Sequence, residues 1–347
     1  MFDKFFGRFS RDIGIDLGTS NTLIYVKDKG IVINEPSVVA INARTEQILS
    51  VGKEAREMVG KTPPHLIISH PLNHGIIADY EVTEKMLRYF IERVHEESFT
   101  LMPRPRVVIG TPLEITEVER KAIEDATLSA GARTVALVEA PMAAAIGARM
   151  PIQEAVGNFI IDIGGGTTEI ATISLGGIVT WKSIRIAGRE MDKNIIQYAR
   201  DAFNILIGER YAEKIKIQAG SALPLKESIA YPIRGRDLIT GLPKEVMATD
   251  AQIRDALARS ITAIVESVKA TMEMTPPELI ADIHERGILL TGGGALLRGI
   301  DRVITNATGI PVRMADDPLT CVVRGTGILL DDEALLREVT LPSARDV

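Results

Sequence analysis

The sequence predicts an α/β protein built from two related domains, and three observations support this. Residues 15–24 (IDLGTSNTLI) and 161–170 (IDIGGGTTEI) repeat one pattern, with Ile, Asp, Gly, Thr and Ile at matching positions. Strand and helix patterns alternate beyond each copy, which is typical of α/β folds. The length of 347 residues allows two domains of ordinary size. A repeat at this spacing suggests two domains with a cleft between them.

Each copy of the repeat reads as a strand, a tight glycine turn and a second strand. Gly164 to Gly166 expose backbone N–H groups with no Cβ in the way, so their turn can form a nest for an anionic phosphate. Asp162 can face a hydrated divalent cation, and Thr167 and Thr168 add hydroxyl groups. Two such turns facing each other would grip a polyphosphate from both sides. An ordinary glycine-rich hairpin is the alternative interpretation of either copy alone.

The composition disfavours several classes of protein. Hydrophobic residues make up 46% and charged residues 25%, as in well-packed globular proteins. A net charge of −6 and an aromatic content of 4% argue against nucleic acid as a partner. The single cysteine, Cys321, allows no disulfide framework and no thiolate metal cluster, which fits a reducing cytoplasm. No apolar run has the length of a membrane span, and charges interrupt the apolar N-terminus, unlike a cleaved signal.

Two segments predict contact with a membrane surface. The N-terminus forms a short helix in this interpretation, with basic residues beside a phenylalanine face made of Phe2, Phe5, Phe6 and Phe9. An apolar patch at 99–103 lies inside a loop, where exposed apolar residues usually mean a contact surface. The alternative for both segments is packing against the protein's own core.

The first half of the chain begins with adjacent strands and continues with alternating helices and strands. Asp79 is expected to cap a helix whose apolar stripe is Val82, Met86, Leu87, Phe90, Ile91 and Val94. A helix over 114–131 is expected to end at Gly131 and to turn five residues inward, namely Ile115, Val118, Ala122, Ile123 and Ala126. The other expected elements are strands at 12–26, 31–34, 37–42, 107–110 and 135–138 and helices at 53–59 and 141–148.

The second half is also expected to alternate strands and helices, with a third glycine turn near its end. Residues 288–300 (ILLTGGGALLRGI) read as a buried strand, a glycine turn and a helix beginning near Ala295, whose N-terminus can favour phosphate. The polar residues from Arg337 onward are expected to be loose. The other expected elements are strands at 178–186, within 221–249 and at 311–314, helices at 188–208, 211–218 and 251–274, and a final apolar helix after Thr320.

Five segments together resemble the MreB family, the bacterial actin-like shape-determining proteins of the actin and heat-shock-chaperone superfamily. They are IDLGTSNT at 15–22, HGIIADYEVTEKML at 74–87, EAPMAAAIGA at 139–148, DIGGGTTE at 162–169 and GILLTGGGALLRG at 287–299. The resemblance implies a duplicated, ribonuclease H-like two-domain ATPase fold with four subdomains around a nucleotide cleft. The implied subdomains are IA (1–36, 74–153 and 322–347), IB (37–73), IIA (154–190 and 252–321) and IIB (191–251).

The resemblance also implies a site for ATP and Mg²⁺. Asp16 and Asp162 would face the metal through water. The helix around Val118 lies where the family's paired filaments meet, and Leu101 and Met102 match its membrane-inserting loop. The implied nucleotide residues are Asp16, Thr19, Ser20 and Asn21 in the first loop, Asp162 and Gly164, Gly165 and Gly166 in the second, Ala212, Glu213, Lys214 and Ile215 with Lys216 beside ribose and adenine, and Gly292, Gly293, Gly294, Ala295 and Leu296 in the remaining adenosine site.

The sequence departs from the family pattern at two places. The family usually has a glutamate directly before Pro-Met-Ala-Ala-Ala, which positions the attacking water, and this chain has Ala140 there. Glu139 is a poor substitute because neighbours in an extended segment point to opposite sides, so Thr167 and Asp162 remain as catalytic candidates and hydrolysis is expected to be slow. His70 and His74 replace residues that are more often arginine and aspartate. No third ligand accompanies them, so loop histidines are a better interpretation than a metal site.

The resemblance therefore implies a cytoplasmic ATP-binding polymer on the inner face of the cell membrane, with weak ATPase activity coupled to polymerisation. Its partners would be further copies of itself, the membrane surface and membrane proteins of the cell-elongation machinery, and its role would be to direct cell shape and lateral wall synthesis. A small-molecule kinase and a chaperone-type ATPase share the same core and remain alternatives. A kinase would need a substrate base, and a chaperone would need a peptide-binding domain after the core.

Overall fold

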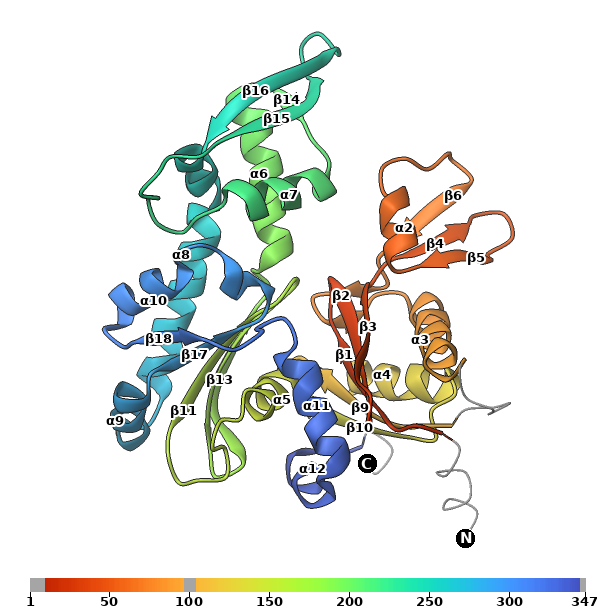
Figure 1. Cartoon of the computed structure of the whole chain (residues 1–347), viewed down its shortest axis with the longest axis vertical. Helices are drawn as coiled ribbons and strands as arrows, with labels where there is room; N and C mark the ends of the chain where they lie inside the picture. The colour runs from red at the N-terminus through yellow and green to blue at the C-terminus, as the bar shows by residue number, and fades with distance from the viewer. Residues whose placement is uncertain (1–9, 97–103, 344–347) are drawn as a thin grey trace. The chain divides into compact units, whose positions relative to one another are not determined.

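A computed structural model describes residues 10–96 and 104–343, and the chain divides into two units (Figure 1). Unit 1 comprises 1–156, 173–179 and 319–347, and unit 2 comprises 157–172 and 180–318. The predicted membrane residues Phe2, Phe5, Phe6, Phe9, Leu101 and Met102 lie outside the described residues. Within the described residues, no helix combines the length and the apolar character needed to cross a bilayer.

Unit 1 is organised around a five-stranded mixed sheet in the order β10-β9-β1-β2-β3. β1 pairs antiparallel with β2 and parallel with β9, and β9 pairs parallel with β10. The predicted first hairpin is therefore confirmed, at the centre of the sheet. The strands are β1 (Ile13–Leu17), β2 (Asn21–Val26), β3 (Gly30–Pro36), β9 (Arg106–Thr111) and β10 (Thr134–Glu139).

Helices pack on the two faces of this sheet because neighbouring residues of β1 point to opposite sides. Ile13 and Ile15 are fully buried in one cluster with residues of α3 (Tyr80–His95) and α4 (Glu117–Ser129). On the other face, a Cβ at Gly14 would overlap Thr326 of α11 (Cys321–Asp331). The Asp79 cap of α3 is confirmed, since its carboxylate accepts a hydrogen bond from the Val82 amide at 3.1 Å and the whole predicted stripe is buried.

Two helices of unit 1 touch backbone to backbone. α5 (Ala140–Gly147) is made of small residues and packs against α11. A Cβ at Gly147 would overlap the carbonyl oxygen of Cys321, and a Cβ at Gly325 would overlap that of Ala143. Glycine is therefore required on both sides of this contact. α12 (Glu333–Val339) follows α11 in the chain.

Unit 2 repeats the strand order of unit 1. Its sheet runs β13-β12-β11-β17-β18, so β11 takes the place of β1 and β17 that of β9, although the connected ends of β12 and β13 (173–179) are counted with unit 1. The equivalent pairs β11–β17 and β17–β18 are parallel, as in unit 1. The duplication expected from the sequence repeat is thus present in the topology. The strands are β11 (Asn158–Ile163), β12 (Thr168–Ser174), β13 (Gly177–Ile184), β17 (Ile288–Thr291) and β18 (Val312–Met314).

One hydrophobic cluster holds the helices of unit 2 to its sheet. Phe159 and Ile161 of β11 are fully buried there with Met191 of α6 and Leu257 of α8. The helices are α6 (Gly188–Phe203), α7 (Glu209–Ala219), α8 (Asp250–Met274), α9 (Pro277–Arg286), the short 3₁₀ helix η1 (Gly293–Leu296) and α10 (Ile300–Thr308).

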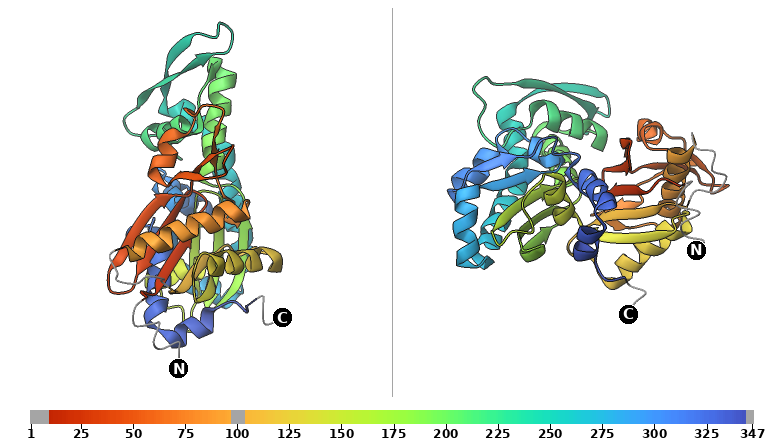
Figure 2. Two further views of the ribbon diagram at one scale, coloured as in Figure 1. Left: turned by 90° about the vertical axis from the view of Figure 1, so that its right-hand side faces the viewer. Right: turned by 60° about the horizontal axis from the view of Figure 1, so that its bottom comes forward.

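Each unit also carries a small three-stranded sheet. In unit 1 the order is β5-β4-β6, with α2 (Lys53–Met58) packed beside it. In unit 2 the order is β14-β15-β16, and Figures 1 and 2 show the β15–β16 hairpin at one end of α6. The strands are β4 (Val39–Asn42), β5 (Ile48–Val51), β6 (Leu66–Ser69), β14 (Ile205–Leu206), β15 (Ala230–Asp237) and β16 (Pro243–Thr249), and a short pair is formed by β7 (Leu72–Asn73) and β8 (Ile76–Ile77).

The expectation that Val118 packs inward was wrong. Its side chain is 78% exposed, although Ile123 and Ala126 on the same helix are buried as expected. The helix begins at Glu117 rather than Glu114 because Thr116 and Glu119 form a reciprocal capping box. Val118 therefore lies in the first turn, on the side of α4 that faces away from the core.

Three helix boundaries also differ from expectation. α6 stops at Phe203 because Asn204 adopts a left-handed conformation with φ of 53°, which ends the helix five residues before Glu209 begins the next. The turn after β17 forms only a 3₁₀ helix, and α10 begins at Ile300 rather than near Ala295. Residues 337–341 are not loose, because α12 continues to Val339 and the Leu341 amide donates to the Leu137 carbonyl at 2.9 Å. α9 (Pro277–Arg286) is an additional helix beyond those expected from the sequence.

Candidate functional site

The turn between β1 and β2 is held by Ser37 from outside the hairpin. The Ser37 hydroxyl donates to the Gly18 carbonyl at 2.6 Å, and the Ser37 amide donates to the Ser20 carbonyl at 3.0 Å. A Cβ at Gly18 would lie 2.6 Å from the Asn21 carbonyl oxygen, so the turn requires glycine there. The conformation of this loop is therefore fixed by its own unit.

Two side chains of the first loop serve the protein itself. Thr19 is buried, and its hydroxyl oxygen accepts a hydrogen bond from the Gly75 amide at 2.6 Å. The Asn21 side chain donates to Oδ1 of Asn34 at 3.0 Å. Asp16 lies near the end of β1, just before the turn, and is opposite Leu23 of β2 in the sheet. The side chains of Thr19 and Asn21 thus hold the loop in place. Ser20 and Asp16 are partly exposed.

The glycine turn after β11 is docked on the first turn of α6. The Gly188 amide donates to the Gly164 carbonyl at 3.1 Å, and the Arg189 amide donates to the Gly165 carbonyl at 2.8 Å. The Gly164 amide closes the turn by donating to the Thr167 carbonyl at 2.9 Å. With its carbonyls engaged in this way, the Gly165 amide forms no hydrogen bond with the residues that the structure describes. A free amide in such a turn suits an anionic oxygen.

Asp162 enters this site from the end of β11, and the third glycine segment packs directly against it. A Cβ at Gly292 would overlap the Asp162 carboxylate, and Gly292 has a φ of +81°, so only glycine suits this position. Burial raises the pKa of Asp162 to about 6. A nearby divalent cation would favour the charged form again, so the residues present fit the implied Mg²⁺.

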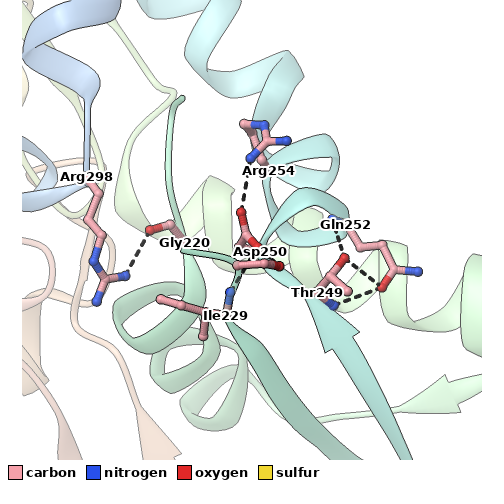
Figure 3. A network of polar contacts seen from close by, with 8 residues as sticks. Gly220, Ile229, Thr249, Asp250, Gln252, Arg254 and Arg298 are labelled. Carbon is pink, nitrogen blue, oxygen red and sulfur yellow. Dashed lines mark hydrogen bonds and ion pairs between the residues drawn. The ribbon is translucent and has the colours of Figure 1, made fainter. Parts of the chain in front are cut away.

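The third glycine segment is tied to α7 by Arg298. Its guanidinium Nη1 donates to the Gln218 carbonyl at 3.1 Å and to the Gly220 carbonyl at 3.2 Å, and Figure 3 shows the second of these bonds. Leu296 in η1 is half exposed. The structure therefore brings the predicted residues 292–296 next to Asp162 and close to the end of α7.

Only part of the predicted stretch 212–216 reaches the glycine turn. Ala212 and Ile215 are fully buried in the core of unit 2, so their side chains stabilise α7 rather than line a site. Lys214 is exposed. Lys216 extends to α6, where Nζ donates to the Gly188 carbonyl at 2.8 Å and lies 2.9 Å from Oδ1 of Asp192.

The sequence reasoning missed Asp192 and Arg298. Asp192 lies four residues after Gly188, in the second turn of a predicted helix, where an acidic residue usually faces solvent. Arg298 follows the third glycine segment directly. No local pattern marks either role, because both depend on how α6, α7 and η1 pack together.

A polar network near Gly220 fixes the segment that follows α7 (Figure 3). Oδ1 of Asp250 accepts hydrogen bonds from the Ser228 hydroxyl at 2.7 Å and the Ile229 amide at 3.1 Å, which lower the pKa of Asp250. Oδ2 of Asp250 pairs with Arg254 at 3.3 Å. Thr249 and Gln252 form a capping box at the start of α8. These bonds attach the β15–β16 hairpin to α8 and serve the scaffold.

Ala140 is the first residue of α5, and Glu139 is the last residue of β10. Glu139 has an extended backbone with φ of −61° and ψ of 130°, and its burial raises the pKa of its carboxyl group. The two neighbours thus belong to different elements. The methyl group of Ala140 can neither accept nor donate a proton.

The histidines at 70 and 74 lie in the loop region between β6 and β8. Within 10–96 and 104–343, no group of three His, Cys, Asp or Glu side chains is arranged to hold a metal ion. A cation at Asp16 or Asp162 would therefore be completed by water and by a phosphate rather than by a protein cage, which is the usual preference of Mg²⁺.

The model of the MreB/Mbl protein family matches residues 10–338. The chain belongs to this family. The cell shape-determining protein MreB of Escherichia coli strain K12 is 51% identical over 335 residues, covering 95% of this chain and 96% of that protein. The resemblance expected from the five sequence segments is thus confirmed.

Two crystal structures of an MreB/Mbl relative, MreB5 of Spiroplasma citri, match the chain over nearly its whole length. The ADP-bound structure has a TM-score of 0.89, 38% identity and coverage of 95% of this chain and 98% of that one. The AMPPNP-bound structure has a TM-score of 0.88, 39% identity and coverage of 93% and 96%. With the duplicated sheets, these matches confirm the actin-like α/β fold.

Proposed function

We propose that this MreB/Mbl protein is a cytoskeletal ATP-binding protein that assembles into filaments on the inner face of the cell membrane and directs cell shape. The observation that carries the proposal is the duplicated hairpin: in each unit the central strand of the five-stranded sheet carries an aspartate near its end and is followed by a glycine turn. The ADP and AMPPNP complexes of the 38–39% identical MreB5 support the nucleotide, and the name of the 51% identical MreB supports the role.

In unit 2 the nucleotide would bind to groups that the structure already arranges. The Gly165 amide would donate to a phosphate oxygen, and Lys216 would supply positive charge nearby. Asp162 would hold Mg²⁺ through water, and Gly292 to Leu296 would border the adenosine. In unit 1 the backbone around Ser20 would bind phosphate and Asp16 would serve a cation through water.

Hydrolysis by this protein would be slow. Ala140 stands where the family usually has the glutamate that positions water, and Glu139 belongs to a different element. The Thr167 hydroxyl is the remaining group of the second loop that could orient a water molecule. A positioned base contributes about 10²–10⁴-fold to the rate. Without it, the protein would bind ATP normally but hydrolyse it slowly.

Membrane contact would come from the phenylalanine segment 2–9 and from Leu101 and Met102. A single short amphipathic segment binds lipid only weakly. A filament presents many copies of it at once, and such multivalency raises the avidity by orders of magnitude. Binding to lipid should therefore depend on ATP-driven assembly.

Sedimentation with liposomes tests this proposal. Purified full-length protein is mixed with anionic phospholipid vesicles, with or without Mg·ATP, and the pellet is examined by electron microscopy. We expect ATP-dependent co-sedimentation and filaments on the vesicles. A control variant should still form filaments with ATP but no longer co-sediment with the vesicles. It carries Phe5→Ser, Phe6→Ser, Leu101→Ser and Met102→Ser. Wild-type protein that stays monomeric and soluble with ATP and lipid would refute the proposal.

A further inference from the structure

The two five-stranded sheets differ in how their edge strands are protected. In unit 1 the β10 edge is covered, because Val138 pairs with Thr340 and the Leu341 amide donates to the Leu137 carbonyl at 2.9 Å. β3 pairs with β2 in an irregular register and ends in Pro36. In unit 2, β18 is only three residues long. Covering, irregular pairing, proline and a short strand are the usual ways in which proteins protect the edge of a sheet.

β13, the remaining edge strand, has none of these protections. It extends over eight residues (Gly177–Ile184), and its neighbour in the sheet is β12. A strand directs its backbone N–H and C=O groups alternately to its two sides, so half of those of β13 point away from β12. No described residue outside the sheet bonds to the backbone of 178–184. The outer edge of β13 is therefore open to a further strand.

The two faces of β13 have different surroundings. Ile184 packs against the core cluster of unit 2, and the hydroxyl groups of Thr180 and Thr275 share a hydrogen bond of 2.9 Å. Alternate residues of a strand lie on the same face, so Val179 and Trp181 share the opposite one. Their side chains are 43% and 42% exposed. One face thus holds the strand in its sheet, and the other presents two apolar side chains beside the open edge.

The charges along this strand are all positive. Residues 177–185 (GIVTWKSIR) contain Lys182 and Arg185 and no acidic residue, whereas the whole chain has a net charge of −6. Neither cation forms an ion pair or a hydrogen bond with any residue in the described ranges 10–96 and 104–343. A segment that complements this edge therefore carries carboxylates. Pairing with a second copy of β13 would bring two Lys182 side chains together, and like charges opposed across a ladder are destabilising.

We propose that β13 is a docking edge for an extended acidic segment of another protein, which adds to the sheet of unit 2 as a further strand. The backbone of that segment would pair with the outward N–H and C=O groups of β13. Its apolar side chains would cover Val179 and Trp181, and its carboxylates would face Lys182 and Arg185. In strand addition the main-chain hydrogen bonds give affinity and the alternate side chains give specificity. The inference uses neither the nucleotide residues nor the predicted membrane segments.

A synthetic peptide of this chemistry tests the inference. The acetylated and amidated peptide ETTEITVT, paired antiparallel with 178–185, would place its isoleucine opposite Trp181, its valine opposite Val179 and its glutamates near Lys182 and Arg185. Trp181 is the only tryptophan in the chain, so its fluorescence reports on this edge alone. Full-length protein without nucleotide is titrated with the peptide. We expect a saturable blue shift of the emission, because the partly exposed indole is removed from water.

Backbone methylation separates strand pairing from contact by side chains alone. Two further peptides each carry a single N-methyl group, one at the central glutamate and the other at the isoleucine that follows it. In an added strand, one of these neighbouring amides points toward β13 and the other points away from it. One methylated peptide should therefore bind about tenfold or more weakly than the other, as expected for a lost backbone hydrogen bond together with a steric clash.

The positive charges are tested by a protein variant with a matched control. Lys182→Gln with Arg185→Gln should bind a fluorescein-labelled ETTEITVT about three- to tenfold more weakly, as expected for the loss of two surface ion pairs. Lys226→Gln with Arg259→Gln removes two exposed cations from other parts of unit 2 and should keep the wild-type affinity. Both variants should keep the wild-type melting temperature, because none of the four side chains is buried.

Four results would overturn the inference. They are an unchanged Trp181 emission at peptide concentrations up to about 1 mM, equal affinities for the two methylated peptides, an unchanged affinity in Lys182→Gln with Arg185→Gln, and a nucleotide-free dimer that the peptide dissociates. The dimer would assign the edge to a second copy of the chain, and sedimentation velocity with and without peptide detects it. All measurements omit ATP and lipid, so their failure would leave the proposed function intact.

Discussion

Gly292 packs so closely against Asp162 that a Cβ at position 292 would overlap the carboxylate. The contact joins the turn after β17 to the end of β11, two strands that are neighbours in the sheet of unit 2. The backbone of the third glycine segment thereby sets the space available around the acidic group. Glycine at 292 is a requirement of this contact as well as of the turn.

Gly292→Ala should lower both stability and nucleotide affinity. We expect a loss of about 2–4 kcal/mol in the free energy of unfolding, from backbone strain at a glycine-only conformation together with overpacking, and at least tenfold weaker binding of Mg·ADP. Urea denaturation and calorimetry measure the two effects. Gly309→Ala is the reference for a positive φ in open space, since Gly309 has φ of 74° and ψ of 1°, a left-handed conformation that alanine reaches more easily than the φ of 81° and ψ of 169° of Gly292. Its losses should be smaller, and equal losses in the two variants would contradict the prediction.

Ala140→Glu should accelerate ATP hydrolysis. The substitution restores a carboxylate at the start of α5, where the family usually carries its water-positioning glutamate, so phosphate release should rise by roughly 10²-fold or more. Release is followed at saturating Mg·ATP, with Ala140→Gln as the control for side-chain size. Equal and rapid release by wild type and Ala140→Glu would contradict the proposal that the natural alanine slows turnover.

His95 should make unit 1 sensitive to acid. Its Nδ1 donates to the Ile91 carbonyl at 2.8 Å and its Nε2 accepts from the Arg11 amide at 3.1 Å, so the neutral ring is required. Burial lowers the pKa of His95 below 6.5, so the folded state disfavours the proton that the unfolded state accepts. This contribution to stability is present above pH 6.5 and is lost as the pH falls below it.

The free energy of unfolding should therefore fall less between pH 7.5 and pH 5.5 in His95→Gln than in wild type, because glutamine can still accept the Arg11 hydrogen bond but does not titrate. Chemical denaturation at the two pH values measures this difference. His284→Gln, at an exposed position of α9, should keep the wild-type pH dependence. The prediction fails if His95→Gln and wild type lose equal stability on acidification.

Gly325→Ala should be among the most damaging single-methyl additions in unit 1. The new Cβ would overlap the Ala143 carbonyl and push α11 away from α5, at a cost of about 2–3 kcal/mol or more. Gly177→Ala, whose Cβ would have 3.9 Å to its nearest neighbour, should change the free energy of unfolding by less than about 1 kcal/mol. Thermal denaturation of both variants decides whether the helix contact is as tight as described.

Val118→Glu should leave the subunit intact and change its assembly. The side chain is 78% exposed, so the free energy of unfolding should move by less than about 0.5 kcal/mol. The resemblance places this helix where paired filaments meet, and a buried unpaired charge there would separate them. Electron microscopy with ATP should show single filaments, whereas Ser129→Glu at the other end of α4 should keep pairs. Paired filaments in Val118→Glu would exclude this contact.

The sequence predicted those elements whose signals are local. α3 carries its own cap at Asp79 and a long apolar stripe, and both glycine hairpins have turn residues that few other structures accept. Val118 shows the limit of such reasoning. An apolar residue at helical spacing looks the same whether it meets the core or a second molecule, and only the packing of α4 distinguishes the two.

The same contrast between local signals and tertiary packing applies to the residues of the site. Asp162 and the glycine turns were predictable because their chemistry lies in a few consecutive residues. Asp192 and Lys216 lie 24 positions apart on two helices. Their contact depends on how α6 and α7 pack together, and hydrophobic periodicity in the sequence does not reveal that packing. Asn204 is similar: an asparagine can continue a helix or end it, and here the left-handed conformation ends it.

Three hydrogen bonds join the first described residues of unit 1 to the strand entry at 104–106 and to the end of α3. Besides the Arg11–His95 bond, the Arg104 amide donates to the Ser10 hydroxyl at 2.8 Å and the Arg106 amide donates to Oδ1 of Asp12 at 3.0 Å. Mechanical load applied to the chain before Ser10 would reach β9 and α3 at once. A pull at this point would therefore be shared by three hydrogen bonds to two different elements rather than borne by one.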